Sequence, residues 1–244
     1  MVWQQVTVTV TALSRMVRRQ RLGELHPILE PAAVWMSPDA GGEADDVMWA
    51  EFARMGLVAG PGRLAPEALD ALSTLAHPAV AYFAVFTYRQ KQYATLVAGV
   101  GGGAVLAFRD GDRVELTGLR RESLPETLLR QLPEMPAADI DSLNVRIAHL
   151  AAGGAAAGAG PSAAKDAAAL ARLGEEPLLG QGELYVGIRD RHGRQRVTED
   201  PIRYHDIQAG RIIVIRSPGY LSVAPATTRL FLDHLHRAHQ ELTE

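Results

Sequence analysis

The sequence has no cysteine among its 244 residues. A disulfide framework, a cysteine zinc site and a thiol nucleophile are therefore all excluded, and the absence fits a reducing cytosol. The chain also lacks an excess of either charge, because 25 lysines and arginines stand against 28 acidic residues and give a net charge of −3. This balance argues against a strongly basic nucleic-acid binder and gives no reason to expect attraction to an anionic membrane.

Long apolar runs are missing as well. The stretch that is most like a membrane segment, residues 93–108, is uncharged but contains four glycines and is only 16 residues long. A spanning helix needs about 20 apolar residues. The first ten residues have no basic region and no small-residue cleavage site, so they do not resemble a signal peptide. We expect a protein without membrane insertion that works in the cytoplasm.

What is present favours a folded α+β protein. Hydrophobic residues make up 47% and charged residues 22%, which are ordinary globular values. Residues 80–87 alternate in a strand pattern with both faces largely apolar, which predicts a central strand. Further strands are expected at residues 3–10, 93–100, 104–108, 114–116, 183–189, 201–206, 211–216 and 220–223, and helices at 13–21, 39–55, 66–76, from 123, and at 227–242.

The second half of the chain repeats the layout of the first. A shift of 107 residues places Gly103 on Gly210 and Val114 on Leu221, and a turn, a strand and a closing helix follow in both copies. We therefore predict pseudo-two-fold duplicated β-sheet/helix units within a single domain, residues 1–244. The halves are residues 1–150 and 172–244, and the Ala/Gly-rich segment 151–171 joins them as a linker or mobile loop whose second part favours helix.

No enzyme signature is present. Residues 99–104 match G-x-G-x-x-A after a strand, but the next turn follows too soon for the helix that a dinucleotide site requires, so a hairpin loop is the better interpretation. His236 and His239 could share a helix face, yet no further zinc ligand lies at a suitable spacing. Neither a nucleophile elbow nor a phosphate-binding P-loop occurs. We predict no catalytic residue, no cofactor and no metal.

Without an enzyme signature, the remaining candidate function is protein binding through exposed apolar side chains. Methionine and aromatic side chains suit adaptable protein recognition, and the sequence offers Trp35, Met36, Met48 and Trp49. A core position is the favoured interpretation for these four residues. The paired carboxylates of the chain, at 45–46, 175–176 and 199–200, are expected to be solvated rather than catalytic.

The C-terminal stretch carries a resemblance to a known family. An aspartate stands shortly before a Gly-Arg strand, and the following strand ends in Ala-Pro before a terminal helix. The residues that match are Asp206, Gly210, Arg211, Ala224 and Pro225. This pattern resembles the EspG family, which are ESX (type VII) secretion-associated proteins of actinobacteria. The Ala/Gly-rich segment 151–171 has no recognisable counterpart in that family.

The resemblance implies a central antiparallel sheet flanked by helical bundles. It also implies a cytosolic, non-enzymatic chaperone that binds PE–PPE heterodimers or related helical secretion substrates, keeps them soluble and passes them to the export machinery. Covering an apolar tip of the substrate is physically sensible, because such a patch promotes aggregation until it is buried. The five matching residues are structural motif positions, and the resemblance names no partner-contact residue. From the family architecture we expect the binding surface on the sheet of residues 201–223 and on the closing helix.

Two alternatives stay open at this point. The first is a small-molecule-binding enzyme with a site between the two halves, near the loop of residues 99–103. The second is a self-associating module, such as a homodimer, that pairs through an open edge of its sheet.

Overall fold

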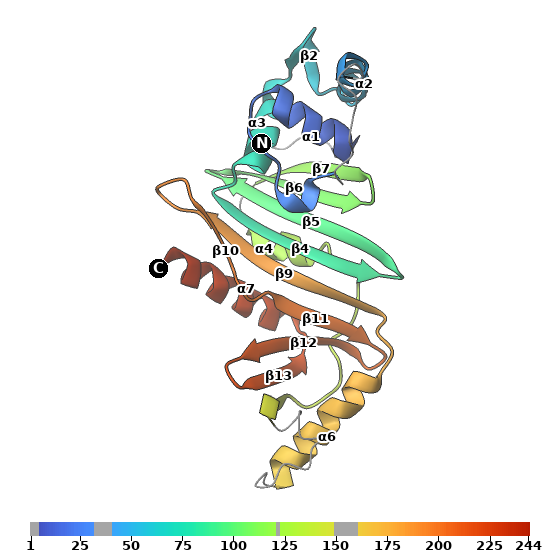
Figure 1. The fold of residues 1–244 in the computed structure, drawn as a ribbon, viewed down its shortest axis with the longest axis vertical. Helices are drawn as coiled ribbons and strands as arrows, with labels where there is room; N and C mark the ends of the chain where they lie inside the picture. Colours follow the sequence, from blue (N-terminus) through green and yellow to red (C-terminus); the bar gives the residue numbers. More distant parts are fainter. Residues whose placement is uncertain (1–4, 32–40, 121–122, 149–160) are drawn as a thin grey trace.

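A computed structural model describes residues 5–31, 41–120, 123–148 and 161–244 (Figure 1). The fold is α+β, and its centre is an 11-stranded sheet in which all strand pairs are antiparallel. In spatial order the sheet contains β1 (Val6–Thr9), β7 (Arg113–Arg120), β6 (Gly103–Asp110), β5 (Lys91–Val100), β4 (Val80–Tyr88), β9 (Gly180–Arg189), β11 (Ile202–Ile207), β12 (Gly210–Ser217), β13 (Tyr220–Pro225) and β8 (Leu143–Arg146), and β10 (Gln195–Val197) pairs with β9.

The helices and a small separate hairpin complete the described structure. The helices are α1 (Val10–Arg19), the short 3-10 helix η1 (Pro27–Leu29), α2 (Gly41–Arg54), α3 (Pro66–Ala76), α4 (Leu124–Leu129), α6 (Pro161–Glu175) and α7 (Thr228–Thr243). The hairpin consists of β2 (Val58–Gly60) and β3 (Arg63–Leu64). No helix within the described residues is long and apolar enough to cross a membrane.

The central position expected for residues 80–87 is confirmed. β4 pairs with β5 on one side and with β9 on the other, over nine residues each time. Its first five residues are all buried, as the apolar pattern on both faces requires. On either side of the β4–β9 contact the strands mostly follow chain order towards the two edges. The duplication of the two halves itself remains a prediction.

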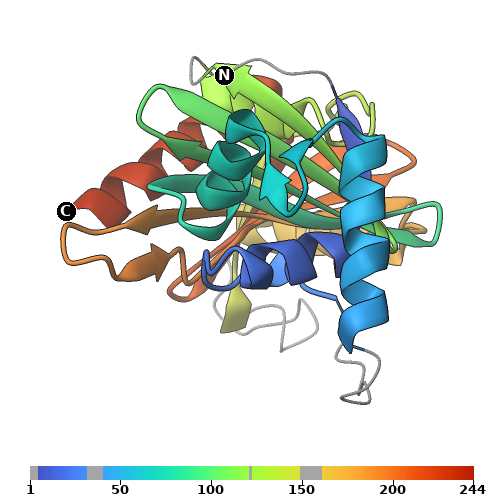
Figure 2. The ribbon, with the colours of Figure 1, turned by 90° about the horizontal axis from the view of Figure 1, so that it is seen from above.

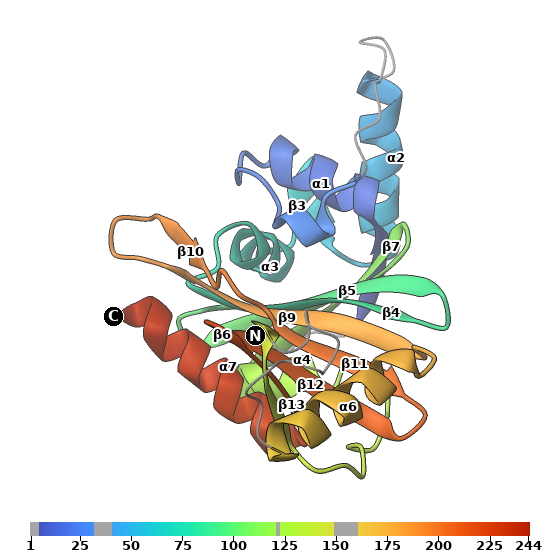
Figure 3. The same cartoon turned by 60° about the horizontal axis from the view of Figure 1, so that its bottom comes forward.

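Helices cover both faces of this sheet (Figures 1 and 3). Phe83 of β4 marks the face that we call the front, where it joins the core cluster beneath α1, α2 and α3. Its neighbour Tyr82 points to the back face, into a second cluster that includes Leu128 of α4 and Leu235 of α7. Figure 2, seen from above, shows α1, α2 and α3 gathered over one end of the molecule. The expectation of a central sheet with helices beside it is therefore confirmed.

A third, smaller cluster lies at the other end of the front face. Leu143, Ile212 and Val223 are buried there, and Leu170 and Leu173 of α6 pack against them. The helical tendency expected for the second part of segment 151–171 thus appears as α6, whereas residues 151–160 lie outside the described part of the chain.

Several predicted elements differ in their details. The N-terminal strand was expected to continue to residue 10, but Val10 begins α1 because the Thr9 hydroxyl accepts a hydrogen bond from Ala12 N and so caps the helix. The glycine-rich stretch 99–104 forms the hairpin between β5 and β6, as interpreted. Met48 is buried and Trp49 packs against the core, whereas Trp35 and Met36 lie outside the described residues.

Candidate partner-binding surface

The centre of the front face forms an open strip between two groups of helices, which we call the helical covers. One cover consists of α1, α2 and α3, and the other is α6. Val85 of β4, Glu183 of β9 and Arg203 of β11 pair across three neighbouring strands and therefore point to the same side. All three are only partly buried. Figure 1 shows α1 and α3 above this strip and α6 below it, with β4, β9 and β11 crossing between them.

Three adjoining hollows make this strip concave. One, of about 350 Å³, lies beside η1, and a second, of about 340 Å³, lies over β4, β9 and β11; they share Val85 and Gln92. A third, of about 510 Å³, lies at the start of β9 and shares Thr87 and Gln181 with the second. Together they form one continuous surface, which we call the central groove.

Each end of the central groove combines apolar side chains with an arginine, Arg109 beside η1 and Arg89 beside the start of β9. Pro27 and Ile28 of η1 line the first hollow. At the other end the third hollow is lined by Met135, Leu178 and Leu179, and the two leucines are 50% and 49% exposed. Large apolar side chains that stay this exposed beside a hollow are typical of a surface that buries them against a partner.

The middle of the groove is polar and internally connected. Tyr185 donates its hydroxyl proton to Glu183 at 2.6 Å, and Arg203 Nε donates to the other oxygen of the same carboxylate at 2.9 Å. Tyr185 is held in place by stacking on Phe83, with ring centroids 5.0 Å apart. Burial, followed by the hydrogen bond to Glu183, raises the pKa of Tyr185 to about 12. His205 lies beside this network, and its burial lowers the pKa of the imidazole.

These polar groups are suited to recognition. Glu183 is already engaged by two donors, so it holds Tyr185 and Arg203 in fixed orientations while Arg203 keeps further N–H groups for a ligand. Within the described part of the chain, no group of three or more histidine, aspartate or glutamate side chains is placed to hold a metal ion. What the arrangement offers is a preorganised polar centre with an apolar contact at each end.

Two of the five family-motif residues, Asp206 and Arg211, come together on the opposite face, and Gly210 precedes Arg211. Asp206 and Arg211 are paired across β11 and β12 and are almost fully buried, at 1% and 6% exposure. Arg211 donates Nε and Nη2 to the two carboxylate oxygens, at 2.6 and 2.8 Å, and Nη2 also donates to the Pro133 carbonyl at 2.9 Å. The guanidinium lies 4.4 Å from the ring centroid of Tyr204. Such a bidentate pair fixes both geometry and charge.

Gly210 allows the backbone beside this ion pair to approach closely. Its φ is +119°, and a Cβ there would lie 2.7 Å from the Ala138 Cα atom. The close approach lets Arg211 N donate to the Pro136 carbonyl at 2.7 Å and lets Ala138 N donate to the Arg211 carbonyl at 2.9 Å. Asp206, Gly210 and Arg211 thus tie the segment between α4 and β8 to the sheet.

The other two motif residues, Ala224 and Pro225, lie one strand away. They pair with Ile213 and Ile212 and end β13. Thr227 follows and caps α7, because its hydroxyl accepts from Leu230 N at 3.2 Å. Asp206 lies on the back face of β11, whereas the groove residues Arg203 and His205 lie on the front face of the same strand. That all five motif positions serve structural support remains a prediction.

The closing helix α7 packs on the back face. Its residues Phe231 and Leu235 are buried against the sheet, and its His239 Nδ1 lies 2.9 Å from the Tyr82 hydroxyl of β4. The binding surface expected from the sequence combined α7 with the sheet of residues 201–223, whereas the structure places α7 and the central groove on opposite faces. Which surface contacts a partner remains a prediction.

Sequence reasoning did not find the central groove. A signal was available in the alternation of Glu183 and Tyr185 around buried Leu184, and of Arg203 and His205 around buried Tyr204. That pattern predicts strands with one polar, partly open face. Nothing local, however, shows that the two strands are neighbours.

The comparisons with known proteins agree with this fold. Among solved structures, the chain is similar to the Mycobacterium tuberculosis type VII secretion system chaperone EspG5, solved in complex with a PE25–PPE41 dimer. The TM-score is 0.69 and the identity 16%, over 96% of this chain and 95% of that chain. A search of curated protein sequences finds no significant match. A model of the EspG family matches residues 9–237. The chain therefore belongs to the EspG family.

Proposed function

We propose that this protein is a cytosolic chaperone of a type VII secretion system. It binds a helical secretion substrate of the PE/PPE or a related type, keeps it soluble and presents it for export. The observation that carries the proposal is the family match over residues 9–237, together with a similar fold in a protein solved in complex with a PE25–PPE41 dimer. The role is binding, without chemistry on the substrate.

We assign substrate binding to the central groove. An apolar tip of a helical protein is an aggregation hazard in water, and the apolar side chains at the ends of the groove offer it a cover. Leu178 and Leu179 are the most accessible apolar contacts there, at about half exposure. Tyr185 and Arg203, both fixed by Glu183, then orient the substrate through polar contacts between the two ends.

No specific observation favours the enzyme alternative near residues 99–103. Gly103 begins β6 directly after the turn, so no helix N-terminus follows the glycines to receive a phosphate. The strand order of the sheet ends at β1 and β8. Self-association through such an edge remains a prediction.

The test is reconstitution with a PE/PPE heterodimer from the same organism. Size-exclusion chromatography is expected to show one stable complex, and calorimetry to give its dissociation constant. The double variant L178E/L179E is expected to weaken binding about tenfold or more, because each leucine side chain contributes on the order of 1 kcal/mol when its exposed half is buried.

The matched control is L69E/V100E, which places the same charges on two other exposed apolar positions, outside the groove. It is expected to bind like the unmodified chain. If no heterodimer binds, the chaperone proposal fails. If binding occurs but both double variants bind normally, the assignment to the central groove is wrong while the chaperone proposal stands.

A further inference from the structure

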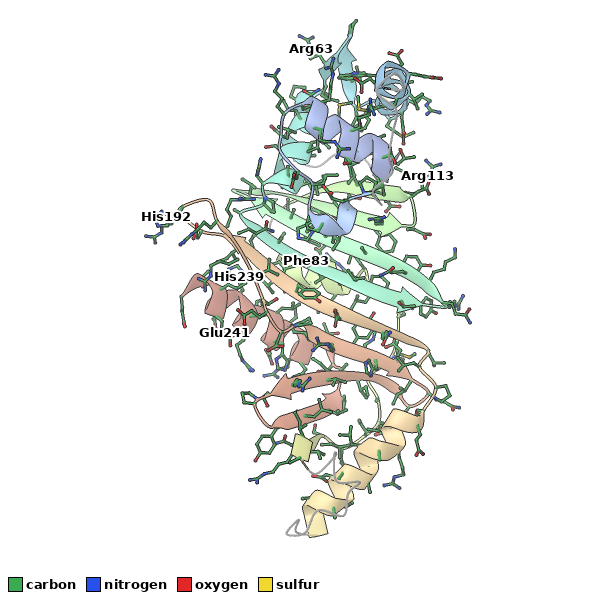
Figure 4. The ribbon with its side chains drawn as sticks, in the orientation of Figure 1. Arg63, Phe83, Arg113, His192, His239 and Glu241 are labelled. Atoms are coloured by element: carbon green, nitrogen blue, oxygen red, sulfur yellow. The ribbon has the colours of Figure 1, made fainter. Side chains whose placement is uncertain are left out.

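A strongly basic hairpin projects from the sheet where β9 turns into β10. Residues 189–196 read Arg-Asp-Arg-His-Gly-Arg-Gln-Arg, so four arginines stand against a single acid. Residues 191–197 are exposed without exception. Figures 1 and 4 show the hairpin extending beyond the sheet near the C-terminal end of α7, with His192 at its tip. We call residues 189–197 the basic hairpin.

The only acid in the basic hairpin is occupied in holding the turn. One Asp190 oxygen accepts backbone N–H groups of His192 and Arg194, each at 2.9 Å, and the other accepts Arg194 Nε at 2.9 Å. Asp190 N in turn donates to the Arg194 carbonyl at 2.9 Å. These bonds, the backbone N–H of Arg194 first, hold the pKa of Asp190 below its usual value. The turn is therefore fixed before any partner arrives.

Two further arginines are engaged, Arg189 within the hairpin and Arg196 with α7. Arg189 Nη1 donates to the Gly193 carbonyl at 2.8 Å, and Arg196 Nη1 donates to the Leu242 carbonyl in the last turn of α7. The remaining two face solvent. The Arg194 side chain is 76% exposed, and the described residues provide no hydrogen bond or ion pair for Arg191. A rigid hairpin with accessible guanidinium groups loses little entropy on binding an anion.

We propose that the basic hairpin docks an acidic segment of a second protein, at a surface separate from the central groove. The forked guanidinium of arginine matches a carboxylate in two parallel hydrogen bonds, and Arg191 and Arg194 present that group outward. Among the described residues that line the three hollows of the central groove, none belongs to the hairpin. Both surfaces can therefore be occupied at the same time.

The observations favour protein carboxylates over nucleic acid or lipid. The basic hairpin contains no phenylalanine, tyrosine or tryptophan on which a base could stack, and Val197 is its only large apolar side chain, which is too little to enter a bilayer. The chain as a whole carries a net charge of −3, so it lacks the long-range field that draws a polyphosphate. Two outward guanidinium groups on a small turn fit a short run of aspartates or glutamates.

The experiment is a fluorescence-anisotropy titration of the full chain with a labelled ten-glutamate peptide at low salt. The double variant R191A/R194A is expected to bind the peptide about fivefold more weakly or worse, because both outward contacts are lost. The matched control R172A/R229A removes two exposed arginines elsewhere and changes the net charge equally. It is expected to bind within twofold of the unmodified chain.

Three outcomes would overturn the proposal. They are no peptide binding by the unmodified chain, an equal loss in both double variants, and tighter binding of single-stranded DNA or phosphatidylglycerol vesicles through the same two arginines. Far-ultraviolet circular dichroism of each variant checks that the fold is kept. Because no secretion substrate enters the titration, its result is independent of the proposed chaperone function.

Discussion

Among single residues, Asp206 and Arg211 are those whose individual replacement we expect to destabilise the fold most, because they form a buried ion pair. Its charges are removed from water and compensated by two mutual hydrogen bonds and by the Pro133 carbonyl. Removing one partner leaves the other charge buried without compensation, which costs far more than the net contribution of the pair itself. The position is therefore one where single and double substitutions behave very differently.

We expect R211M to lower the free energy of unfolding by about 3–5 kcal/mol, because Asp206 then remains buried alone. The double variant D206L/R211M is expected to recover a large part of that loss, since no charge is left in the interior. Urea unfolding of the two variants measures the difference. R203M, which removes a half-exposed partner of Glu183, serves as the control and should cost about 1 kcal/mol or less. A double variant as unstable as R211M would contradict the argument.

At the scale of helices and strands, the periodicity of apolar residues predicts the long elements and misses the short ones. Residues 80–87 and 227–242 carry several repeats of an apolar pattern, and both become the expected strand and helix. β8 has only Leu143 and Val145 as buried positions, and it exists because β13 lies beside it. Two apolar residues are too few for a pattern, so a strand of this kind depends on tertiary pairing.

The central groove is hidden from the sequence for a related reason. It forms where β4 meets β9, strands about 100 residues apart in the chain, and where two helical covers leave a strip open. The family motif is visible because it is local, with Asp206 and Arg211 only five residues apart. The local ion pair is thus predictable from these residues, whereas the proposed recognition surface requires the fold.

The packing of η1 on β4 introduces a pH dependence. His26 precedes η1 and is buried, with its ring 4.4 Å from that of Phe83, and its Nδ1 has no hydrogen-bond partner in the described structure. Burial lowers the pKa of His26 from 6.5 to about 4. Between these two values the unfolded chain binds the proton and the folded chain does not, so stability falls as the pH falls through this window.

We expect the free energy of unfolding to be lower at pH 5 than at pH 7 by about 2 kcal/mol from His26 alone. The physical cause is that a buried imidazolium without a partner is disfavoured. Urea unfolding of the unmodified chain and of H26L at both pH values isolates this contribution, since His205 and His234 titrate in the same sense in both proteins. Equal pH dependence in the two proteins would show that His26 is not responsible.

For the whole molecule, the front face is the feature on which we base the proposed binding function. Two helical covers stand at its ends, each over its own core cluster, and the strands between them remain open. A single continuous sheet connects the two covers, so a partner in the groove would contact both ends of one rigid support. Binding there is linked to folding, because the unfolded chain has no groove.

A bound PE/PPE-type heterodimer is therefore expected to stabilise this protein against heat in proportion to the logarithm of its concentration. At one hundred times the dissociation constant the gain is about 2.7 kcal/mol, which corresponds to a rise in Tm of about 5–11 °C for a domain of this size. Differential scanning calorimetry over a concentration series measures the rise. At the same concentrations L178E/L179E should show about half of this rise or less, because its binding is about tenfold weaker or worse, whereas R191A/R194A should show all of it, because the groove and the basic hairpin are separate surfaces. Loss of the rise in R191A/R194A would mean that the two surfaces bind one partner together.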